Sequence, residues 1–211
     1  MLLYKSNNPA VSIVLPTYNR ASLLERAIHS LLNQTLNDWE LIIADDGSTD
    51  STFELAERLI TEHENVRYIK HSHRKLPLTL NAGINAAAGD YISFLGSDDE
   101  YHRDYLNQRL EYMKKNPEID LIHGGVKIIG DPYVKDKNNP GEKIHLSECI
   151  IGGTFFGKRS MYLEMKGFKN LDYSEDSDFY ERAYKRFRIM KVDLAPYFYY
   201  RDTPDSICNT I

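Results

Sequence analysis

The sequence predicts an α/β fold built on a mostly parallel sheet. Over about the first hundred residues, short apolar runs alternate with segments in which apolar residues recur at helical spacing. The resulting order, four strands separated by three helices, is typical of parallel strands joined by right-handed crossovers. With 211 residues, of which 42% are hydrophobic and 27% charged, the chain has the size and composition of one globular domain with at most a modest extension.

The first strand is predicted over residues 11–15, a compact apolar run that ends at Pro16. Leucine, isoleucine and alanine then recur at helical spacing over 21–32, which predicts the first helix. A second apolar run over 39–44 predicts the next strand, and a polar turn follows it at 45–50.

The second helix is predicted directly after this turn. Ser51 and Glu54 have the spacing of a capping box, which marks a helix start. The apolar side chains expected on one face of this helix are Phe53, Ala56, Leu59 and Ile60. The remaining elements of this half are a strand over 66–69, a helix over 78–88 and a strand over 89–95.

Beyond residue 100 the alternation is looser. Helices are predicted over 105–115, 158–166 and 176–187. A long polar loop is predicted over 130–145, and loops of that length are often functional. Further strands are predicted within 120–129, at a strand end near 150–151, over 189–194 and over 197–200.

Composition and charge argue against several classes of protein. The net charge of −5 disfavours a nucleic-acid-binding protein, which normally carries a basic patch. No apolar run approaches the roughly 18 residues of a membrane span and no leader opens the chain, so neither is expected. Cys149 and Cys208 fit no zinc or redox spacing, which favours a reducing, cytoplasmic environment.

Polar turns follow three of the predicted strands, at 16–20, 45–48 and 96–99. In a parallel sheet these turns emerge at one edge, where ligands of such folds bind. Tyr18 offers a ring for a base, and adjacent carboxylates such as Asp98 and Asp99 repel each other unless a cation or donor groups occupy the site. The turns therefore suggest a nucleotide cradle. The alternative is a solvated strand-to-helix turn in which Asp99 caps a helix.

Four segments, at 12–20, 38–50, 80–84 and 89–99, resemble in order and spacing the motifs of glycosyltransferase family 2, whose members are inverting enzymes with the GT-A fold. The resemblance extends from residue 11 to about residue 205. It implies a single GT-A domain over 1–211, a three-layer α/β/α sandwich. Residues 1 to about 100 would form the nucleotide-sugar-binding half, and the remainder would form the acceptor-binding half.

The same resemblance implies a set of donor-binding residues. They are Pro16, Thr17, Tyr18, Asp45, Lys75 (with Arg74 as an alternative), Ser97, Asp98 and Arg201. Asp98 would be the ligand of Mn²⁺ or Mg²⁺, since Ser97 and Asp98 match the last two positions of the family's Asp-x-Asp motif. Gly96 stands where that motif has its first Asp. The carboxylate that usually contacts the ribose or sugar is therefore missing at this position. Thr203 stands where many relatives carry His.

Inverting transfer needs a base that takes the proton of the acceptor hydroxyl. The segment 173–178 resembles the family's Glu-Asp motif, which implies that Asp176 is this base. The alternative is that these acidic residues only stabilise the N-terminus of a helix, where negative charge is favourable. The acceptor-binding residues implied are Asp99, Thr154, Phe155 and Glu175.

Residues 152–158 nearly spell a phosphate-binding loop, but Arg159 replaces the Ser or Thr that would hold magnesium. The family instead places this segment at the acceptor pocket, and simple core packing explains its aromatic residues equally well. A basic cluster formed by Lys185, Arg186, Arg188 and Lys191 suits either a solvated helix end, which is favoured, or contact with anionic lipid or an acceptor phosphate.

The sequence thus predicts metal-dependent transfer of a sugar from a nucleotide-sugar, most often a UDP-sugar in this family, to a glycan or lipid-linked acceptor. By analogy the process is surface polysaccharide assembly, in the cytoplasm or peripherally at the inner face of the membrane. A catalytically silent nucleotide-sugar-binding subunit is the alternative. A glycosidase with paired carboxylates is disfavoured, because it needs no nucleotide cradle.

Overall fold

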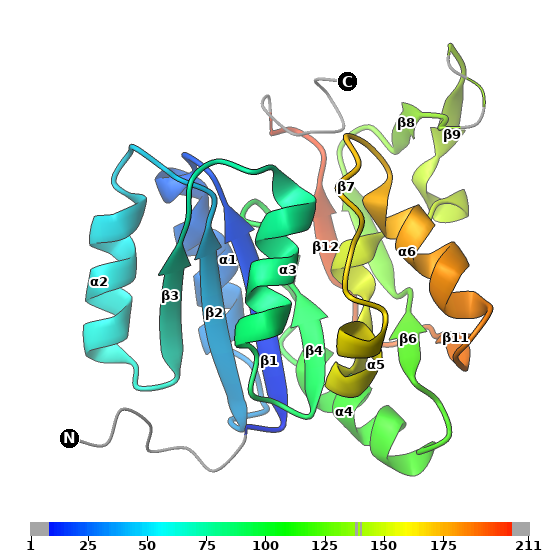
Figure 1. Ribbon diagram of the computed structural model, residues 1–211, viewed down its shortest axis with the longest axis horizontal. Coiled ribbons are helices and arrows are strands. Elements are labelled where there is room, and N and C mark those ends of the chain that lie inside the picture. The colour runs from blue at the N-terminus through cyan, green and yellow to red at the C-terminus, as the bar shows by residue number, and fades with distance from the viewer. Residues whose placement is uncertain (1–8, 138, 140, 204–211) are drawn as a thin grey trace.

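The computed structural model describes residues 9–203 apart from 138 and 140, and its central feature is a seven-stranded sheet with helices on both faces (Figure 1). The strand order is β11-β6-β10-β4-β1-β2-β3. The first four strands of the chain are parallel: β1 (Val11–Thr17), β2 (Trp39–Asp45), β3 (Val66–Lys70) and β4 (Tyr91–Phe94). This confirms the predicted α/β class and its alternating first half.

The second half extends the same sheet with shorter strands. β10 (Phe156–Lys158) lies antiparallel between β4 and β6 (Leu121–His123). The edge strand β11 (Ile189–Lys191) is parallel to β6. The sheet is therefore mostly parallel, with one reversed strand between its two halves.

Within the described residues, six α-helices form the outer layers. They are α1 (Ala21–Leu32), α2 (Thr52–Glu62), α3 (Leu76–Ala86), α4 (Tyr105–Lys115), α5 (Arg159–Glu164) and α6 (Glu175–Tyr184). Apolar side chains of α1, α2 and α4 share one core with the sheet, and those of α3, α5 and α6 share a second core. Along β1, Ile13 and Leu15 enter the first core and Val14 the second, because successive strand residues face opposite sides.

Two small sheets lie beside this sandwich. One has the order β5-β12-β7 and consists of β5 (Glu100–Tyr101), β12 (Tyr197–Tyr200) and β7 (Val126–Ile129). The other is the hairpin of β8 (Tyr133–Lys135) and β9 (Lys143–His145). Short 3₁₀ turns, η1 (Leu146–Glu148) and η2 (Gly152–Thr154), lead from the hairpin to β10.

The structure corrects the predicted start of α2. Ser51 makes no capping bond through its side chain; instead the Asp50 carboxylate accepts from the Thr52 backbone N–H at 3.1 Å. The buried face of α2 carries Leu55, Ala56 and Leu59, whereas the predicted members Phe53 and Ile60 are exposed.

Other differences concern the second half of the chain. The predicted polar loop 130–145 contains the hairpin β8–β9, and residues 150–151 belong to no strand. Cys208 lies outside the described residues. None of the helices in the described part of the chain has both the length and the apolar character that crossing a membrane requires.

Candidate active site

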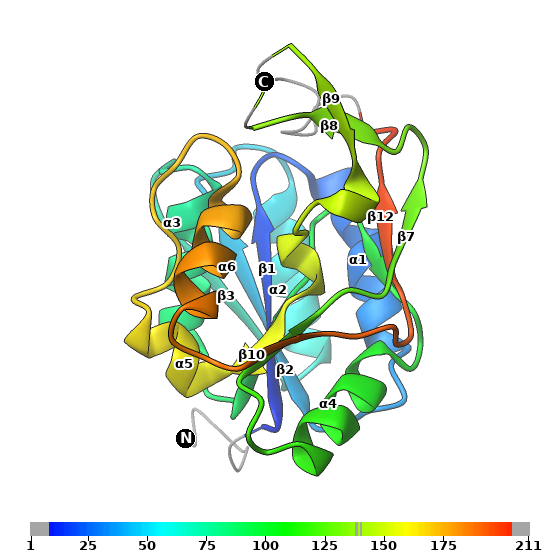
Figure 2. The same cartoon turned by 90° about the vertical axis from the view of Figure 1, so that its right-hand side faces the viewer.

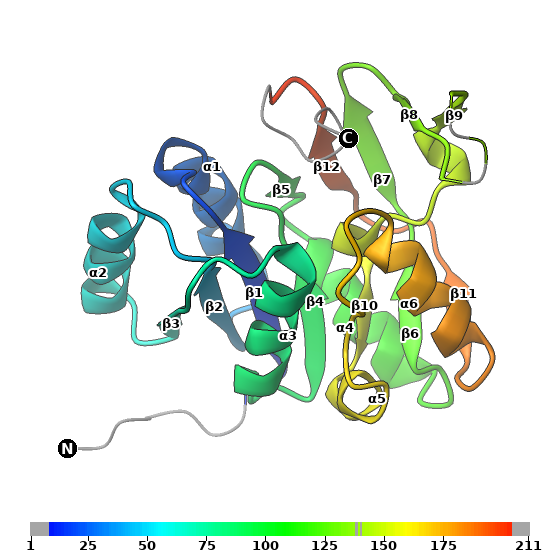
Figure 3. The same ribbon diagram turned by 45° about the horizontal axis from the view of Figure 1, so that its top comes forward.

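A large cavity of about 1000 Å³ opens where the strands β1 and β4 end. Its walls come from the turns after these strands, the start of α3, the hairpin β8–β9, the segment before η2 and the start of α6. Figures 2 and 3 show the hairpin standing beyond this end of the sheet, on the same side as the start of α6. The cavity therefore lies at the edge predicted from the polar turns and is closed by the second half of the chain.

An aromatic ring and an acid lie together on one wall of the cavity. Tyr18, which is 42% exposed, stacks on the ring of His73 with centroids 4.2 Å apart. The buried Asp46 carboxylate lies 2.8 Å from His73 Nδ1 and accepts from the backbone N–H groups of Arg74 and Lys75 at 2.7 and 3.0 Å. Asp46 thus fixes the loop that presents His73 to Tyr18.

Asp45, one of the expected donor-binding residues, does not line this cavity. It is the last residue of β2 and is fully buried, with its carboxylate accepting from the Ser48 N–H at 2.8 Å and from the Tyr68 hydroxyl at 2.5 Å. Because neighbouring strand residues face opposite ways, Asp46 is the acid that lines the cavity. The structure therefore does not bring Asp45 to the cavity and places Asp46 there instead.

The Thr17 hydroxyl is buried in the lining of the cavity and has no hydrogen-bond partner among the described residues. Buried hydroxyls nearly always have a partner, so this atom is suited to bond a ligand. Pro16 lines the cavity beside it. Lys75 also lines the cavity, and its ammonium group contacts the exposed Asp172 at 2.5 Å.

Three residues in the lining that are not glycine have left-handed backbone: Asn19, Lys75 and Ser174, with φ of 52°, 73° and 61°. Such a conformation costs about 1–2 kcal/mol for a residue with a side chain. Unfavourable backbone of this kind tends to gather at functional sites. Its concentration in this lining agrees with a binding role for the cavity.

The turn after β4 carries the adjacent carboxylates. Asp98 pairs with Arg20, with Nη1 and Oδ2 3.1 Å apart, and the Ser97 hydroxyl accepts from the same guanidinium nitrogen at 3.4 Å. The backbone carbonyl of Asp98 accepts from Arg26. Ser97 and Asp98 both line the cavity, and their contact with a diphosphate stays a prediction.

Asp99 has a different environment. It is only 3% exposed, and its two oxygens accept from the Tyr197 hydroxyl at 2.5 Å and from the Tyr200 N–H at 2.9 Å. Burial, and then the charge of Asp98, raise the pKa of Asp99 to about 7. Asp99 lies in the lining, but its carboxylate is bound to the strand β12, so it caps no helix.

The oxygen ligands at this turn fit a divalent cation only in part. Within residues 9–203, apart from the two that are not described, no three His, Cys, Asp or Glu side chains gather to hold a metal. Asp98 and Ser97 nevertheless offer hard oxygen atoms to the cavity. Mg²⁺-like ions are commonly held by one or two carboxylates together with substrate phosphates, so the turn suits a cation that arrives with a diphosphate.

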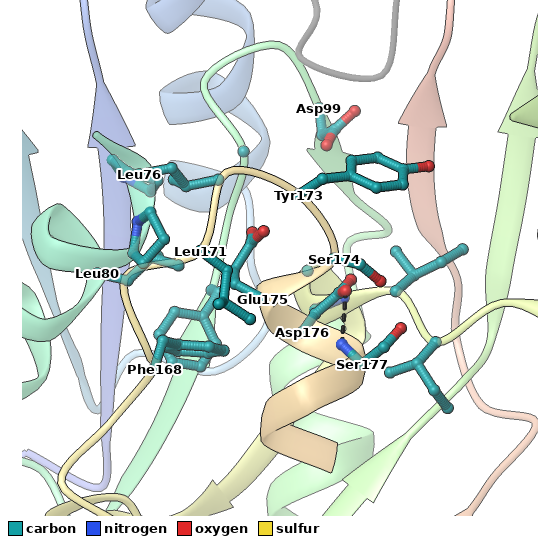
Figure 4. A pocket seen from close by; sticks show the side chains of 18 of the residues that line it. Leu76, Leu80, Asp99, Phe168, Leu171, Tyr173, Ser174, Glu175, Asp176 and Ser177 are labelled. Carbon is teal, nitrogen blue, oxygen red and sulfur yellow. Dashed lines mark hydrogen bonds between the residues drawn. The ribbon is translucent and has the colours of Figure 1, made fainter. Parts of the chain in front are cut away.

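Two acids face the cavity at the start of α6 (Figure 4). The Asp176 carboxylate accepts from the Gly152 N–H at 2.9 Å and from the Ser177 N–H at 2.7 Å. Glu175 points toward the region of the cavity where Asp99 lies. Burial, followed by the charge of Asp176, raises the pKa of Glu175 to about 7. Burial also raises the pKa of Asp176, while its N–H partners oppose that rise.

The remainder of the cavity wall is largely aliphatic. Near the hairpin it is lined by Val134, Ile144, Leu146, Ile150 and Ile151. A further group of apolar side chains, formed by Leu76, Leu80, Phe168 and Leu171, lies beside Glu175 (Figure 4). Lys135 and Lys137 of the hairpin region also line the cavity, and Lys137 pairs with Glu181 at 2.7 Å.

Besides Asp45, three residues predicted for the site lie outside the cavity lining. Phe155 is fully buried in the second core, and the Thr154 hydroxyl bonds the Ile151 carbonyl at 2.8 Å and the Gly124 N–H at 3.1 Å. Core packing, the alternative for this segment, is therefore what the structure shows. Arg201 is 7% exposed and donates to the Asp131 carbonyl at 3.3 Å, away from the cavity wall.

Sequence reasoning missed His73, Arg20 and Tyr197 as parts of the site. The histidines are scattered through the sequence without ligand spacing, so nothing local indicated that His73 lies against Tyr18. The pairing of Arg20 with Asp98 joins residues far apart in the chain. Only the position of Arg20 within the first polar turn, beside Tyr18, could have indicated it.

Comparisons with known proteins agree with this arrangement. The model of glycosyl transferase family 2 matches residues 12–188. The uncharacterized glycosyltransferase EpsJ of Bacillus subtilis is 38% identical over 217 residues, which cover 94% of this chain and 63% of that protein. A GalNAc(5)-diNAcBac-PP-undecaprenol beta-1,3-glucosyltransferase of Campylobacter jejuni is 28% identical over 88% of this chain and 66% of its own.

Among solved structures, S. aureus TarS (residues 1–349) in complex with UDP-GlcNAc superposes with a TM-score of 0.79. Its identity is 21%, and the match covers 95% of this chain and 61% of that one. This chain thus spans less than two thirds of TarS 1–349, of EpsJ and of the C. jejuni enzyme. Because the family model spans most of the chain and the architecture agrees, the protein belongs to glycosyl transferase family 2 and has the GT-A fold.

Proposed function

We propose that this protein is an inverting glycosyltransferase that moves a sugar from a UDP-sugar to a lipid-linked glycan during polysaccharide synthesis. The proposal rests on one observation, that two walls of the same cavity carry different functional groups. One has a stacked aromatic ring and the Asp98 turn, and the other has the Glu175–Asp176 pair. A nucleotide held at the first wall would present its sugar to the acids of the second.

On the donor side, Tyr18 would stack the nucleobase, and the unpartnered Thr17 hydroxyl would bond it. Asp46 takes the acidic role first expected of Asp45, because it lines the cavity and holds the loop of His73 and Lys75. UDP is favoured because TarS, which shares the fold, was solved with UDP-GlcNAc.

Asp98 would hold Mn²⁺ or Mg²⁺ together with the diphosphate of the donor, and such an ion neutralises charge that develops on the leaving group. Arg20, which already pairs with Asp98, lies where it can add a second positive charge. Ser97 adds a neutral oxygen at the same turn. The chain's own contribution is thus to orient the diphosphate with its sugar toward α6.

Asp176 would remove the proton of the acceptor hydroxyl. Its two N–H partners orient the carboxylate and favour the charged form that a base needs. Each oxygen retains a lone pair for the incoming proton. Glu175, whose carboxylate faces the cavity, would bind a hydroxyl of the acceptor.

The acceptor side suits an amphiphilic molecule. The aliphatic wall from Val134 to Ile151 can cover an apolar group, and Lys135 at the same wall can pair with a phosphate. The relative from C. jejuni is named for a glycan joined through a diphosphate to undecaprenol. We therefore propose a lipid-linked acceptor, which would bring the protein to the membrane surface as a peripheral enzyme.

Calorimetric titration with UDP and GDP, each in Mn²⁺ and in a chelator, tests the donor site. We expect UDP to bind more tightly in Mn²⁺, and UDP-sugars then to be consumed when a lipid diphosphate glycan is added. Binding of neither nucleotide under both conditions would remove the basis for a transferase.

A catalytically silent nucleotide-sugar-binding protein is the second candidate. It is favoured by one observation, that Gly96 supplies no carboxylate at a turn whose Asp98 is already paired with Arg20. Release of UDP from UDP-sugars without an acceptor separates the two, because a silent binder releases none.

A further inference from the structure

The turn that precedes Asp98 is closed around Gly96. A Cβ placed on Gly96 would lie 2.5 Å from Asp99 Oδ2 and 3.1 Å from the Tyr197 hydroxyl. Real Cβ atoms do not approach other atoms as closely as the first of these distances. The backbone at position 96 therefore leaves no room for any side chain while Asp99 and Tyr197 keep their places.

Tyr197 belongs to β12, in the second half of the chain, yet its hydroxyl serves this turn. It accepts from the Gly96 N–H at 3.0 Å and donates to Asp99 Oδ2 at 2.5 Å. The Gly153 backbone packs closely against the Tyr197 ring, since a Cβ on Gly153 would lie 2.6 Å from it. Tyr197 is 1% exposed, so both bonds are shielded from water. Hydrogen bonds are stronger in the protein interior than in water.

A second residue of β12, Tyr200, also holds the turn. The Tyr200 N–H donates to Asp99 Oδ1 at 2.9 Å, and the Tyr200 ring stacks under the Arg26 guanidinium at 3.8 Å. Arg26 in turn donates to the carbonyl of Asp98. The strand thus holds the turn at Gly96 and Asp99 directly, and at Asp98 through Arg26.

We propose that Tyr197 is a positioning residue for donor binding: by holding Gly96 and Asp99, its hydroxyl fixes the turn so that Asp98 faces the diphosphate and its cation. This inference rests on the proposed function. Tyr197 borders the cavity, but its hydroxyl is committed to the turn on both sides. It acts through Asp98, so its removal should affect the metal-dependent part of nucleotide binding.

The test compares Tyr197→Phe with Tyr162→Phe. Tyr162 is a matched control, because it is also fully buried but its hydroxyl has no hydrogen-bond partner among the described residues. UDP affinity is measured by calorimetry in Mn²⁺ and in a chelator. For Tyr197→Phe we expect affinity in Mn²⁺ to fall about tenfold, the order expected for a lost bond to a charged group, and affinity in chelator to stay within about twofold.

The outcomes separate this role from a merely structural one and from failure of the proposed function. Equal losses in Mn²⁺ and chelator, or a Tyr197→Phe protein that behaves like Tyr162→Phe, overturn the positioning role alone. A wild-type protein whose UDP binding does not respond to Mn²⁺ overturns the metal step of the proposed function, and the positioning role with it.

If Tyr197→Phe does not fold, Gly96→Ala provides the same comparison from the other side of the contact, because its new methyl group presses on Asp99 and Tyr197. Loss of Mn²⁺-dependent affinity with chelator affinity kept supports the proposal. An unchanged response to Mn²⁺ contradicts it.

Discussion

The two acids at the start of α6 differ in how the fold holds them. Asp176 accepts from the backbone N–H groups of Gly152 and Ser177, whereas the Glu175 carboxylate interacts with the backbone N–H of its own residue. Adjacent carboxylates in one cavity often take separate roles because their surroundings stabilise different protonation states. Here the N–H donors favour the charged form at Asp176, the form that a base requires.

Substitution of Asp176 by Asn should abolish transfer and leave donor binding nearly intact. General base catalysis contributes about 100-fold to 10,000-fold, and the amide cannot take the proton. The measurement is turnover of UDP-sugar with acceptor, beside calorimetric UDP binding. Glu175→Gln is the control, for which we expect a raised acceptor KM and a smaller loss of kcat. If Glu175→Gln stops turnover and Asp176→Asn does not, the roles are reversed.

Glu175 should make the protein less stable as the pH rises. Its pKa is raised from 4.5 to about 7 in the folded protein, so the folded state binds the proton more tightly than the unfolded state. The stabilising contribution is complete below about pH 4.5 and is lost as the pH rises through about 7. Unfolding midpoints between pH 5 and 8 should therefore fall less steeply in Glu175→Gln than in wild type. Parallel curves would show that the residue titrates normally.

At the scale of elements, the hairpin β8–β9 supplies a wall that the sheet does not provide. Lys135 lies directly across from Lys143 in its register, and Lys143 is paired with Asp131, with Nζ and Oδ2 3.7 Å apart. Lys135 also lines the cavity. The hairpin is thus suited to the phosphate of an acceptor.

Reversal of this charge by Lys135→Glu should raise the KM for a lipid diphosphate acceptor about threefold to tenfold, an effect that weakens in high salt. Hydrolysis of the donor without acceptor should not change, because the diphosphate turn lies on another wall. Lys114→Glu, on the exposed part of α4, is the control of equal charge change. Equal effects of the two variants would assign the result to net charge alone.

Elements were predictable from sequence where the apolar period was unambiguous. α1 and α4 begin and end at the predicted residues, since their side chains pack against a single sheet face. The start of α2 was not, because the Asp50 carboxylate accepts from the Thr52 N–H at 3.1 Å and also from the N–H of Ala21 at 3.0 Å, a tertiary contact that the local sequence does not show. The hairpin was not predicted because strands of three residues are too short to show an alternation of apolar and polar residues.

At the scale of the whole molecule, the position of the cavity could be predicted from the family motifs. Which residues of these motifs line the cavity depends on tertiary packing. Tyr18, Asp98 and Asp176 line it as predicted. Asp45 and Phe155 do not, because strand alternation and core packing turn them inward. Contacts between the halves, such as that of Tyr197 with Gly96, join positions about a hundred residues apart and leave no local signal.

Donor binding should stabilise the whole fold, since the cavity is built from both halves. At a UDP concentration one hundred times Kd, in Mn²⁺, the gain is about 2.7 kcal/mol. For a chain of this size that corresponds to a rise of roughly 5–11 °C in Tm. Thermal unfolding with UDP, with GDP and with neither provides the measurement. An unchanged Tm with both nucleotides would contradict binding at this site.

The left-handed residues Asn19, Lys75 and Ser174 show where this sequence gives up stability. Glycine at Ser174 would relieve about 1 kcal/mol of backbone strain, and part of that gain would be lost to the greater freedom of the unfolded chain. Selection for heat resistance alone would therefore favour glycine at Ser174, whereas Asn19 would be kept by its bond to the Thr49 N–H at 2.7 Å. A laboratory lineage evolved for thermostability without an activity screen should accept such a change in the cavity lining, and so lose turnover before it loses its fold.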